Sequence, residues 1–402
     1  MISKQEALAN LGVPAKNRVL LSIDGGGMRG IFTIQLLKKL EEVAGAPCYV
    51  WCDMVAGTST GAIIAALLLT KHTALEIEEK YIALVSKVFT KRNLLADRFL
   101  NPPKFDKVNY RKHVKQIIGD ITLQEACQNS GIDCMLTSKD MTAGEETFFT
   151  CFKKPDSTYS GTYKEVLLRA VMEATMSAPT YFSPFERFID GGTTTYNNPT
   201  LAAIMEAVQY SGNLYDSKKL TVFSFGTGTT LRFIKPTATH DPAGPDSKFW
   251  LNYVMDETSK DASEMQIDIV RSGLISGLQL RRYQVSFDST MLLQIPNKDI
   301  TDIHNIKADS LHELQDDELA EIDMADVTKF PLMKIIGASV AEFICPPAEA
   351  SLPLSKRKGN WFQEDFITTD TKRGRLVTAR GAIDAIRKNL SNANWIDAQP
   401  TK

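Results

Sequence analysis

The chain has 402 residues, of which 43% are hydrophobic and 23% are charged, values typical of a globular protein. This composition argues against extensive disorder and against a fibrous protein. The formal net charge of −2 provides no global basic field, so we do not expect a nucleic-acid polymer as the main partner.

The cysteines and the apolar runs indicate the compartment. The six cysteines form no C-x-x-C pair and the five histidines are dispersed, so we predict reduced thiols and no metal site. The N-terminus lacks the apolar core of a signal peptide. The longest apolar run, 62–69, is far shorter than a membrane-spanning helix. We therefore expect a cytoplasmic protein that contacts membranes only peripherally.

Two consecutive strand–loop–helix units open the chain. The apolar run 18–23 predicts a buried strand, the glycine-rich loop 24–30 follows, and the apolar spacing in 31–44 predicts a helix that ends at Gly45. The second unit repeats this order, with a strand at 51–56, the loop GTSTG and an apolar helix. Such alternation predicts an α/β fold of three layers, in which helices cover both faces of a mostly parallel sheet.

The remainder of the chain continues this pattern with two interruptions. We predict further strands at 132–137, 146–152 and 220–225, and one helix at 163–176. Segments 91–107 and 235–247 interrupt the pattern, and two interpretations stay open for them: lids over an apolar pocket, or ordinary surface loops. From about residue 346 the composition becomes that of a linker.

The loop Gly57-Thr58-Ser59-Thr60-Gly61 fits the pattern G-x-S-x-G. This pattern places a serine on a sharp turn between a strand and a helix, where a side chain on either glycine would clash. The serine hydroxyl then stands near a helix N-terminus, which favours developing negative charge. We predict that Ser59 is a nucleophile; the alternative is a turn with a capping serine.

A nucleophilic serine requires a base. None of the histidines lies in a motif that would orient it: His72, His113, His240, His304 and His312. Asp190 is the better candidate, because the two glycines after it allow a close approach to another backbone segment. The alternative interpretation of Asp190-Gly191 is an ordinary turn.

The loop Asp24-Gly25-Gly26-Gly27-Met28-Arg29-Gly30 presents several backbone N–H groups to one point, at the start of a helix. It is therefore a cradle for an anion, either a phosphate or the oxyanion of acyl transfer. The spacing matches neither common nucleotide-binding loop. Beside a serine elbow, an oxyanion hole is the simpler interpretation.

These motifs together resemble the patatin-like phospholipase family. DGGGMRG, GTSTG and DGG occur in the family's order, accompanied by SAPTYFSP at 177–184, NNP at 197–199 and FGTGT at 225–229. The resemblance covers about residues 18–343. It implies a lipid acyl hydrolase that cleaves fatty-acyl esters of phospholipids or other lipids at a membrane surface, without metal or cofactor.

The resemblance also implies a role for each motif. Ser59 would be the nucleophile on the elbow formed with Gly57 and Gly61, and Asp190 would be its base. The oxyanion hole would consist of the glycine loop: Gly25, Gly26, Gly27 and Arg29. In this loop Gly26 and Gly27 would offer N–H groups, and Arg29 would support either the loop or the phosphate of a lipid.

Regulation and domain organisation complete the expectations. Some bacterial relatives are membrane-degrading antiphage effectors activated by a cyclic nucleotide, and we hold the same regulation as a hypothesis. We expect an N-terminal segment at 1–17, a hydrolase domain at 18–345 and a C-terminal extension at 346–402. Three basic clusters would bind phosphate or anionic lipid, or else be solvated surface: Lys91-Arg92, Arg281-Arg282 and Lys356-Arg357-Lys358. Two other functions stay open, a transacylase and a non-enzymatic phosphate-binding scaffold.

Overall fold

The computed structural model divides the chain into two compact units, residues 1–366 and 367–402. The structure describes residues 2–88, 105, 107–152, 163–230, 247–304, 306–320, 322, 324–345, 366–367, 388 and 391–394. The two predicted lids lie outside the described residues except for 105, 107 and 247. The predicted extension after 346 lies outside them except for 366–367, 388 and 391–394, so the second unit is not considered further.

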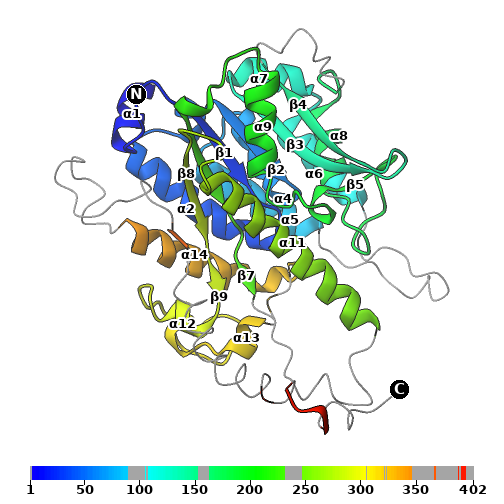
Figure 1. Ribbon diagram of the computed structural model, residues 1–402, viewed down its shortest axis with the longest axis vertical. Helices are drawn as coiled ribbons and strands as arrows, with labels where there is room; N and C mark the ends of the chain where they lie inside the picture. Colours follow the sequence, from blue (N-terminus) through cyan, green and yellow to red (C-terminus); the bar gives the residue numbers. More distant parts are fainter. Residues whose placement is uncertain are drawn as a thin grey trace. The chain divides into compact units, whose positions relative to one another are not determined.

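A mostly parallel sheet forms the centre of the first unit (Figure 1). Its strands run in the order β8-β6-β1-β2-β3-β4, and β5 pairs with β3. All neighbours are parallel except β4 and β5, which are antiparallel to β3. These strands are β1 (Arg18–Ile23), β2 (Met54–Thr58), β3 (Asp133–Asp140), β4 (Glu145–Cys151), β5 (Phe188–Asp190), β6 (Leu220–Phe225) and β8 (Gln279–Gln284). The shorter strands β7 (Thr229–Thr230) and β9 (Ser286–Phe287) pair with each other, and β10 spans Phe366–Ile367.

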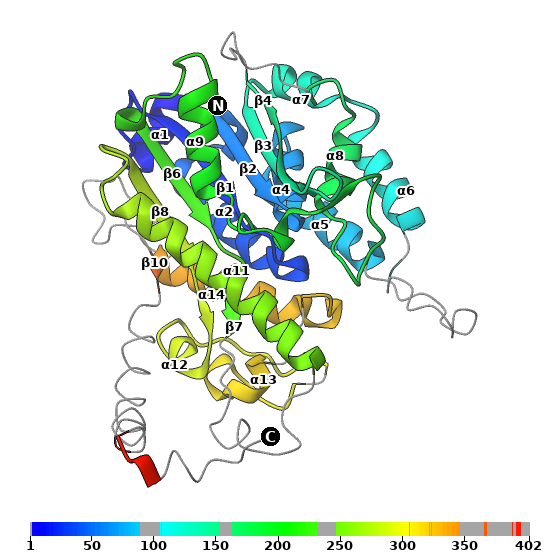
Figure 2. The same ribbon diagram turned by 45° about the vertical axis from the view of Figure 1, so that its right-hand side comes forward.

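Helices cover both faces of the sheet, and Figure 2 shows α9 and α11 on one face with α2 and α4 on the other. In the first half of the chain the helices are α1 (Lys4–Asn10), α2 (Gly30–Ala44), α3 (Cys48–Trp51), α4 (Thr60–Leu69), α5 (Ala74–Val88), α6 (Lys107–Ile118), α7 (Leu123–Ser130) and α8 (Leu168–Thr175). The later helices are α9 (Thr200–Tyr210), α11 (Ser247–Arg271), α12 (Ser289–Leu292), α13 (Asp316–Ala320) and α14 (Phe330–Ile344). Short 3-10 helices are η1 (Gly27–Arg29), η2 (Gly191–Thr193), η3 (Ser217–Lys219), η4 (Leu311–Glu313) and η5 (Val327–Lys329).

Alternate residues of β1 enter two separate hydrophobic cores. Val19, Leu21 and Ile23 pack with the buried residues of α2 and α4. Leu20 packs on the opposite face with Ala203 and Ile204 of α9. Because every position from 19 to 23 is buried, the strand is a continuous apolar run and lacks the alternation of a half-exposed strand. The predicted fold class is confirmed.

The predicted strands and helices that fall on described residues are present, and two of them begin several residues later than predicted. β1 and β6 have the predicted bounds, and α2 ends at Gly45 with the left-handed φ of 72°. The strand predicted at 51–56 is present as β2, but it begins only at Met54, because Cys48–Trp51 form a helical turn after Pro47. A short apolar run does not distinguish a buried helical turn from a strand. The helix predicted at 163–176 begins only at Leu168, and β5 was not predicted.

Among the helices that the structure describes, none combines the length and the apolar character needed to cross a bilayer.

Candidate active site

Ser59 occupies a strained turn between β2 and α4. Its backbone has φ 53° and ψ −123°, in a region that residues with a side chain rarely adopt. A Cβ on Gly57 would lie 2.6 Å from the carbonyl oxygen of Gly61, and a Cβ on Gly61 would lie 2.5 Å from that of Ile23. Glycine is therefore required at both positions, as the elbow pattern predicts.

Strand register brings Asp190 to Ser59. Thr58, the last residue of β2, is paired with Thr137 of β3, and the next residue of β3, Ser138, is paired with Asp190 at the end of β5. The Ser59 Oγ donates a hydrogen bond to Asp190 Oδ2 over 2.5 Å. Two residues 131 positions apart in the sequence thus meet at the carboxyl end of β2.

The DGG motif lets the carboxylate approach this closely. A Cβ on Gly191 would lie 2.2 Å from Thr137 Oγ1, so only glycine allows the turn to pack on β3. The Gly192 N–H donates to Asp190 Oδ1 over 2.7 Å, which holds the carboxylate with Oδ2 toward Ser59. The side chain is buried, and burial raises the pKa of Asp190 to about 7, although the hydrogen bonds from Ser59 and Gly192 lower it.

The glycine loop passes directly beside the nucleophile. A Cβ on Gly25 would lie 3.3 Å from the Ser59 Cβ. The Gly25 N–H donates to the Asn197 carbonyl, and the Met28 N–H donates to the Met324 carbonyl. Within the described part of the chain, the N–H groups of Gly26 and Gly27 have no hydrogen-bond partner. Both belong to the N-terminus of a helical segment that continues from η1 into α2, where an anion is favoured.

Arg29 lies on the same loop. Its Nε donates to the Gly26 carbonyl oxygen over 3.4 Å, and its backbone N–H donates to the same oxygen over 3.2 Å. The Arg29 side chain thus contacts the loop backbone, and its function in the site stays a prediction.

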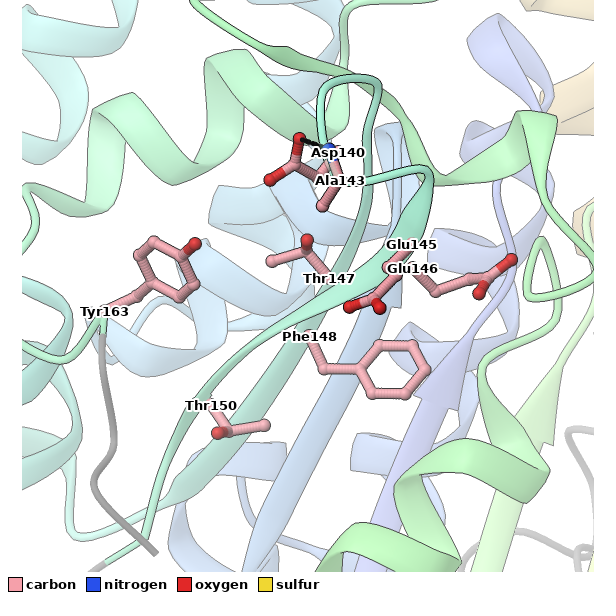
Figure 3. Close-up of a pocket in the computed structure, with 8 residues that line it drawn as sticks. All are labelled: Asp140, Ala143, Glu145, Glu146, Thr147, Phe148, Thr150 and Tyr163. Atoms are coloured by element: carbon pink, nitrogen blue, oxygen red, sulfur yellow. Dashed lines mark hydrogen bonds between the residues drawn. The ribbon is translucent and has the colours of Figure 1, made fainter.

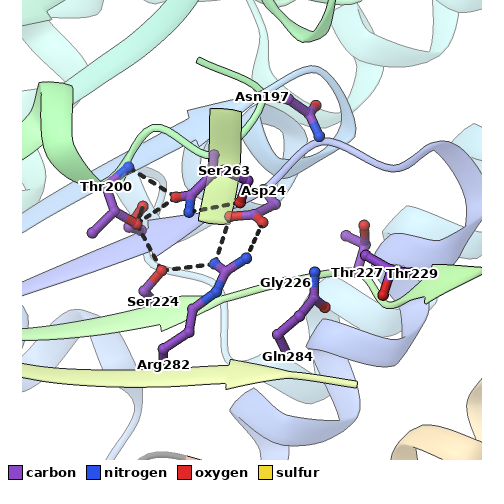
Figure 4. A network of polar contacts seen from close by, with 12 residues as sticks. Asp24, Asn197, Thr200, Ser224, Gly226, Thr227, Thr229, Ser263, Arg282 and Gln284 are labelled. Carbon is purple, nitrogen blue, oxygen red and sulfur yellow. Dashed lines mark hydrogen bonds and ion pairs between the residues drawn. The ribbon is translucent and has the colours of Figure 1, made fainter. Parts of the chain in front are cut away.

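A buried ion pair supports the start of the loop, and Figure 4 shows the polar network around it. Arg282 of β8 holds both carboxylate oxygens of Asp24, with distances of 2.9 and 2.5 Å. Arg282 also donates to Ser224, whose hydroxyl lies 2.6 Å from that of Thr200. Burial raises the pKa of Asp24, whereas the charge of Arg282 lowers it. The network joins three strand ends beneath the loop.

The prediction that Arg281-Arg282 is a surface basic cluster is wrong. Both side chains are buried, with exposed fractions of 4% and 3%. Arg281 donates to the carbonyl groups of Leu11 and Gly12 and lies 4.9 Å from the centre of the Phe223 ring. Both arginines therefore serve internal packing and cannot receive an external phosphate. The other two clusters, Lys91-Arg92 and Lys356-Arg357-Lys358, lie outside the described residues.

The histidines do not approach the nucleophile in the part of the chain that is described. His72 contacts Thr70 and the Leu67 carbonyl, His113 contacts Lys87, and His312 contacts the Ile295 carbonyl. No hydrogen bond joins any of these, or His304, to Ser59, and His240 lies outside the described residues.

A surface pocket of about 250 Å³ lies away from this site, on the β3–β4 hairpin (Figure 3). Its walls include Asp140, Glu146 and Tyr163 but neither Ser59 nor Asp190. The pocket does not take part in the arrangement described above.

Several contacts of the site had no signal in the sequence. Thr175 accepts the Ser59 N–H over 2.9 Å, and Thr227 donates to the Gly25 carbonyl over 2.9 Å. Thr227 and Asn197 belong to the FGTGT and NNP motifs, which the sequence marks without indicating a function for them. Only the folded structure shows that both motifs hold the glycine loop.

Residues 21–204 match the family model described as patatin-like phospholipase. These residues form a patatin-like phospholipase domain. The match contains the glycine loop, the serine elbow and Asp190, whereas Arg282 and Met324 follow it in the chain.

Several known proteins are similar to this chain over parts of their length. An intracellular phospholipase A2 of Caenorhabditis elegans is 31% identical over 235 residues, which cover 56% of this chain and 21% of the worm protein. A cGAMP-activated phospholipase of Escherichia coli (strain TW11681) is 29% identical over 202 residues, covering 46% of this chain and 55% of that protein. A cUMP-AMP-activated phospholipase of Escherichia coli is 42% identical over 77 residues, covering 19% and 24%. The chain thus spans between a fifth and about half of the length of these relatives.

The raised pKa of Asp190 predicts that Asp190→Asn stabilises the patatin-like domain at high pH. In the unfolded chain the carboxyl ionises near pH 3.9, whereas in the folded chain it keeps its proton until about pH 7. Its contribution to stability is therefore present below pH 4 and is lost as the pH rises through 7. We expect the variant to be more stable than the wild type by about 1–3 kcal/mol at pH 8, with a smaller difference at pH 4.

Urea unfolding of both proteins at these pH values measures the difference. The exposed aspartate Asp216, replaced in Asp216→Asn, is the control and should show no such trend. A variant that is less stable than the wild type at pH 8 would contradict the burial of an ionisable carboxyl at this position.

The Asp24–Arg282 pair predicts a second change in stability. Arg282→Met leaves the buried Asp24 carboxylate without its partner, and we expect a loss of about 3–5 kcal/mol in the free energy of unfolding. Asp24→Asn combined with Arg282→Met removes both charges, so the double variant should recover part of this loss. Chemical denaturation measures all three proteins, and a double variant no more stable than Arg282→Met would argue against a paired buried charge.

Proposed function

We propose that this chain is a lipid acyl hydrolase that cleaves fatty-acyl ester bonds of phospholipids through Ser59 and Asp190. The observation that carries the proposal is the 2.5 Å hydrogen bond from Ser59 Oγ to a buried carboxylate. It lies in a strained elbow, beside two N–H groups that have no partner among the residues that the structure describes. We further propose residues 18–345 as the hydrolase domain.

The proposed reaction has two steps, and in each of them Asp190 accepts a proton and then gives it up. Ser59 Oγ attacks the ester carbonyl carbon while its proton passes to Asp190 Oδ2, and the tetrahedral intermediate expels the alcohol, which takes up that proton. The enzyme then holds an acyl-serine. Water loses a proton to Asp190 as it attacks the acyl carbon, the fatty acid departs, and the proton returns to Ser59 Oγ.

The environment of Asp190 suits the task of a base. Its pKa of about 7 lies close to a neutral working pH, where a base combines a useful ionised fraction with a strong affinity for the proton. An aspartate of ordinary acidity would be almost fully ionised but would accept the serine proton poorly. Burial thus substitutes for the histidine that serine hydrolases more often use.

The glycine loop supplies electrostatic stabilisation. We assign the oxyanion hole to the N–H groups of Gly26 and Gly27, because the Gly25 and Met28 N–H groups are engaged elsewhere. Gly25 shapes the loop through its close approach to Ser59 and Asn197. Each donor that is aimed at the developing oxyanion contributes roughly 3 kcal/mol to lowering the barrier.

We also propose peripheral contact with a membrane and activation by a cyclic nucleotide. The support is indirect: two relatives in Escherichia coli are named as cGAMP-activated and cUMP-AMP-activated phospholipases. Under this proposal the chain is a ligand-gated effector that degrades membranes in antiphage defence.

Hydrolysis of a fluorogenic phospholipid in vesicles tests the proposal. Ser59→Ala and Asp190→Asn should each lower kcat by at least about 1000-fold while remaining folded, because each removes one part of a concerted unit. The double variant should lose little more than either single variant. Two variants in the connection between α9 and β6, Ser211→Ala and Asp216→Asn, serve as matched controls and should retain activity.

The same assay, repeated with cyclic di- and trinucleotides, tests the regulation. Activity that appears only with one nucleotide supports the effector, and full activity without any ligand contradicts it. Full activity of Asp190→Asn would contradict the dyad. Transfer of the acyl group to an added alcohol in preference to water would indicate a transacylase.

A further inference from the structure

The peptide bond between Gly27 and Met28 is held at both of its polar atoms. The Tyr81 hydroxyl donates to the Gly27 carbonyl oxygen over 2.5 Å. On the other side, the Met28 N–H donates to the Met324 carbonyl oxygen over 2.7 Å. The preceding peptide is also anchored, since the Gly26 carbonyl accepts from Arg29. These contacts leave the Gly27 N–H without a partner among the described residues.

Gly27 itself does not restrict the backbone conformation of this loop. Its φ is +58°, in the left-handed region that glycine adopts freely, and a Cβ here would lie 2.2 Å from the Met324 carbonyl oxygen. Glycine rotates easily about both of its torsions, so the direction of its N–H depends on how the two flanking peptides are held. Arg29 and Gly30 hold these peptides from within the loop. Tyr81 and Met324 hold them from outside it.

Tyr81 is a rigid part of this arrangement. It lies on α5, which packs against α2 and α4, the helices that follow the glycine loop and the serine elbow. Its side chain is fully buried, and its ring meets the ring of Phe330 edge-on with centroids 6.4 Å apart. A Cβ on Gly30 would lie 2.2 Å from the Tyr81 hydroxyl, so the first residue of α2 leaves room for this hydrogen bond.

We propose that Tyr81 is a positioning residue of the oxyanion hole. It fixes the Gly27–Met28 peptide while Arg29 holds the Gly26–Gly27 peptide, and together these contacts set the torsions of Gly27 so that its N–H points to the developing oxyanion. This inference rests on the proposed acyl transfer at Ser59. Tyr81 touches neither the nucleophile nor the base in a hydrogen bond given by the structure. It acts through Gly27, so its loss should slow the chemical step without altering the ionisation of Asp190.

The variant Tyr81→Phe removes one hydroxyl and preserves the ring. Tyr215→Phe is the matched control, because Tyr215 is also buried and its hydroxyl donates to the Asp53 carbonyl and to Asp133, at the amino ends of β2 and β3. Both variants lose a buried hydroxyl, but only one of the two hydroxyls contacts the glycine loop. Thermal melts confirm that both proteins are folded before activity is compared.

We expect Tyr81→Phe to lower kcat for the phospholipid by about 10-fold or more with an unchanged KM, and Tyr215→Phe to retain kcat. The pH at which activity is half-maximal should be the same in Tyr81→Phe as in the wild type, because the surroundings of Asp190 are intact. The rate at which a fluorophosphonate labels Ser59 should fall in parallel, since its phosphoryl oxygen takes the position of the oxyanion.

The outcomes separate this inference from the proposed function. Equal kcat values for the two tyrosine variants, or a loss carried by KM, would overturn the role of Tyr81. If the wild type shows no Ser59-dependent hydrolysis of the phospholipid, the proposed substrate fails, and the labelling rate still decides the role of Tyr81. Labelling that is equally fast in Tyr81→Phe and in the wild type contradicts the inference in either case.

Discussion

The contact between Ser59 and Asp190 depends on three strands being in register. Thr58 lies opposite Thr137, and Ser138 lies opposite Asp190, so a shift of one residue in either pairing would turn a reactive side chain to the wrong face of the sheet. The glycines serve this register: Gly57 and Gly61 allow the elbow, and Gly191 allows β5 to approach β3. The strained φ of Ser59 is tolerated because the surrounding packing determines the turn.

Long-range contacts fix the glycine loop, which has no rigidity of its own. The loop is held from the β6 turn by Thr227, from α5 by Tyr81, and through Asp24 from β8 by Arg282. The Met324 carbonyl binds it from a segment that follows the patatin-like match. The glycine loop thus contacts elements that lie far apart in the sequence. Any ligand that moves one of these elements has a physical route to the proposed oxyanion hole.

Short sequence patterns predict the features that depend only on residues close together in the chain. The apolar runs of β1 and β6, the stop of α2 at Gly45 and the elbow around Ser59 all follow from short patterns. Asp190 was suggested by its DGG context, but its distance to Ser59 follows from strand pairing over 131 positions. Tyr81, Arg282 and Thr175 carry no local pattern, because their partners are backbone or side-chain atoms that only folding brings near. The burial of Arg281 and Arg282 was mispredicted for the same reason.

The central claim is that Asp190 takes the proton of Ser59. The most direct measurement is the rate of Ser59 labelling by a fluorophosphonate between pH 5 and pH 9, in the wild type and in Asp190→Asn. Because burial raises the pKa of Asp190 to about 7, the wild-type rate should rise with pH through about 7 and then level off. The variant should react slowly, with no rise in this range. Similar pH profiles and rates in both proteins would contradict the claim and assign the base to another group.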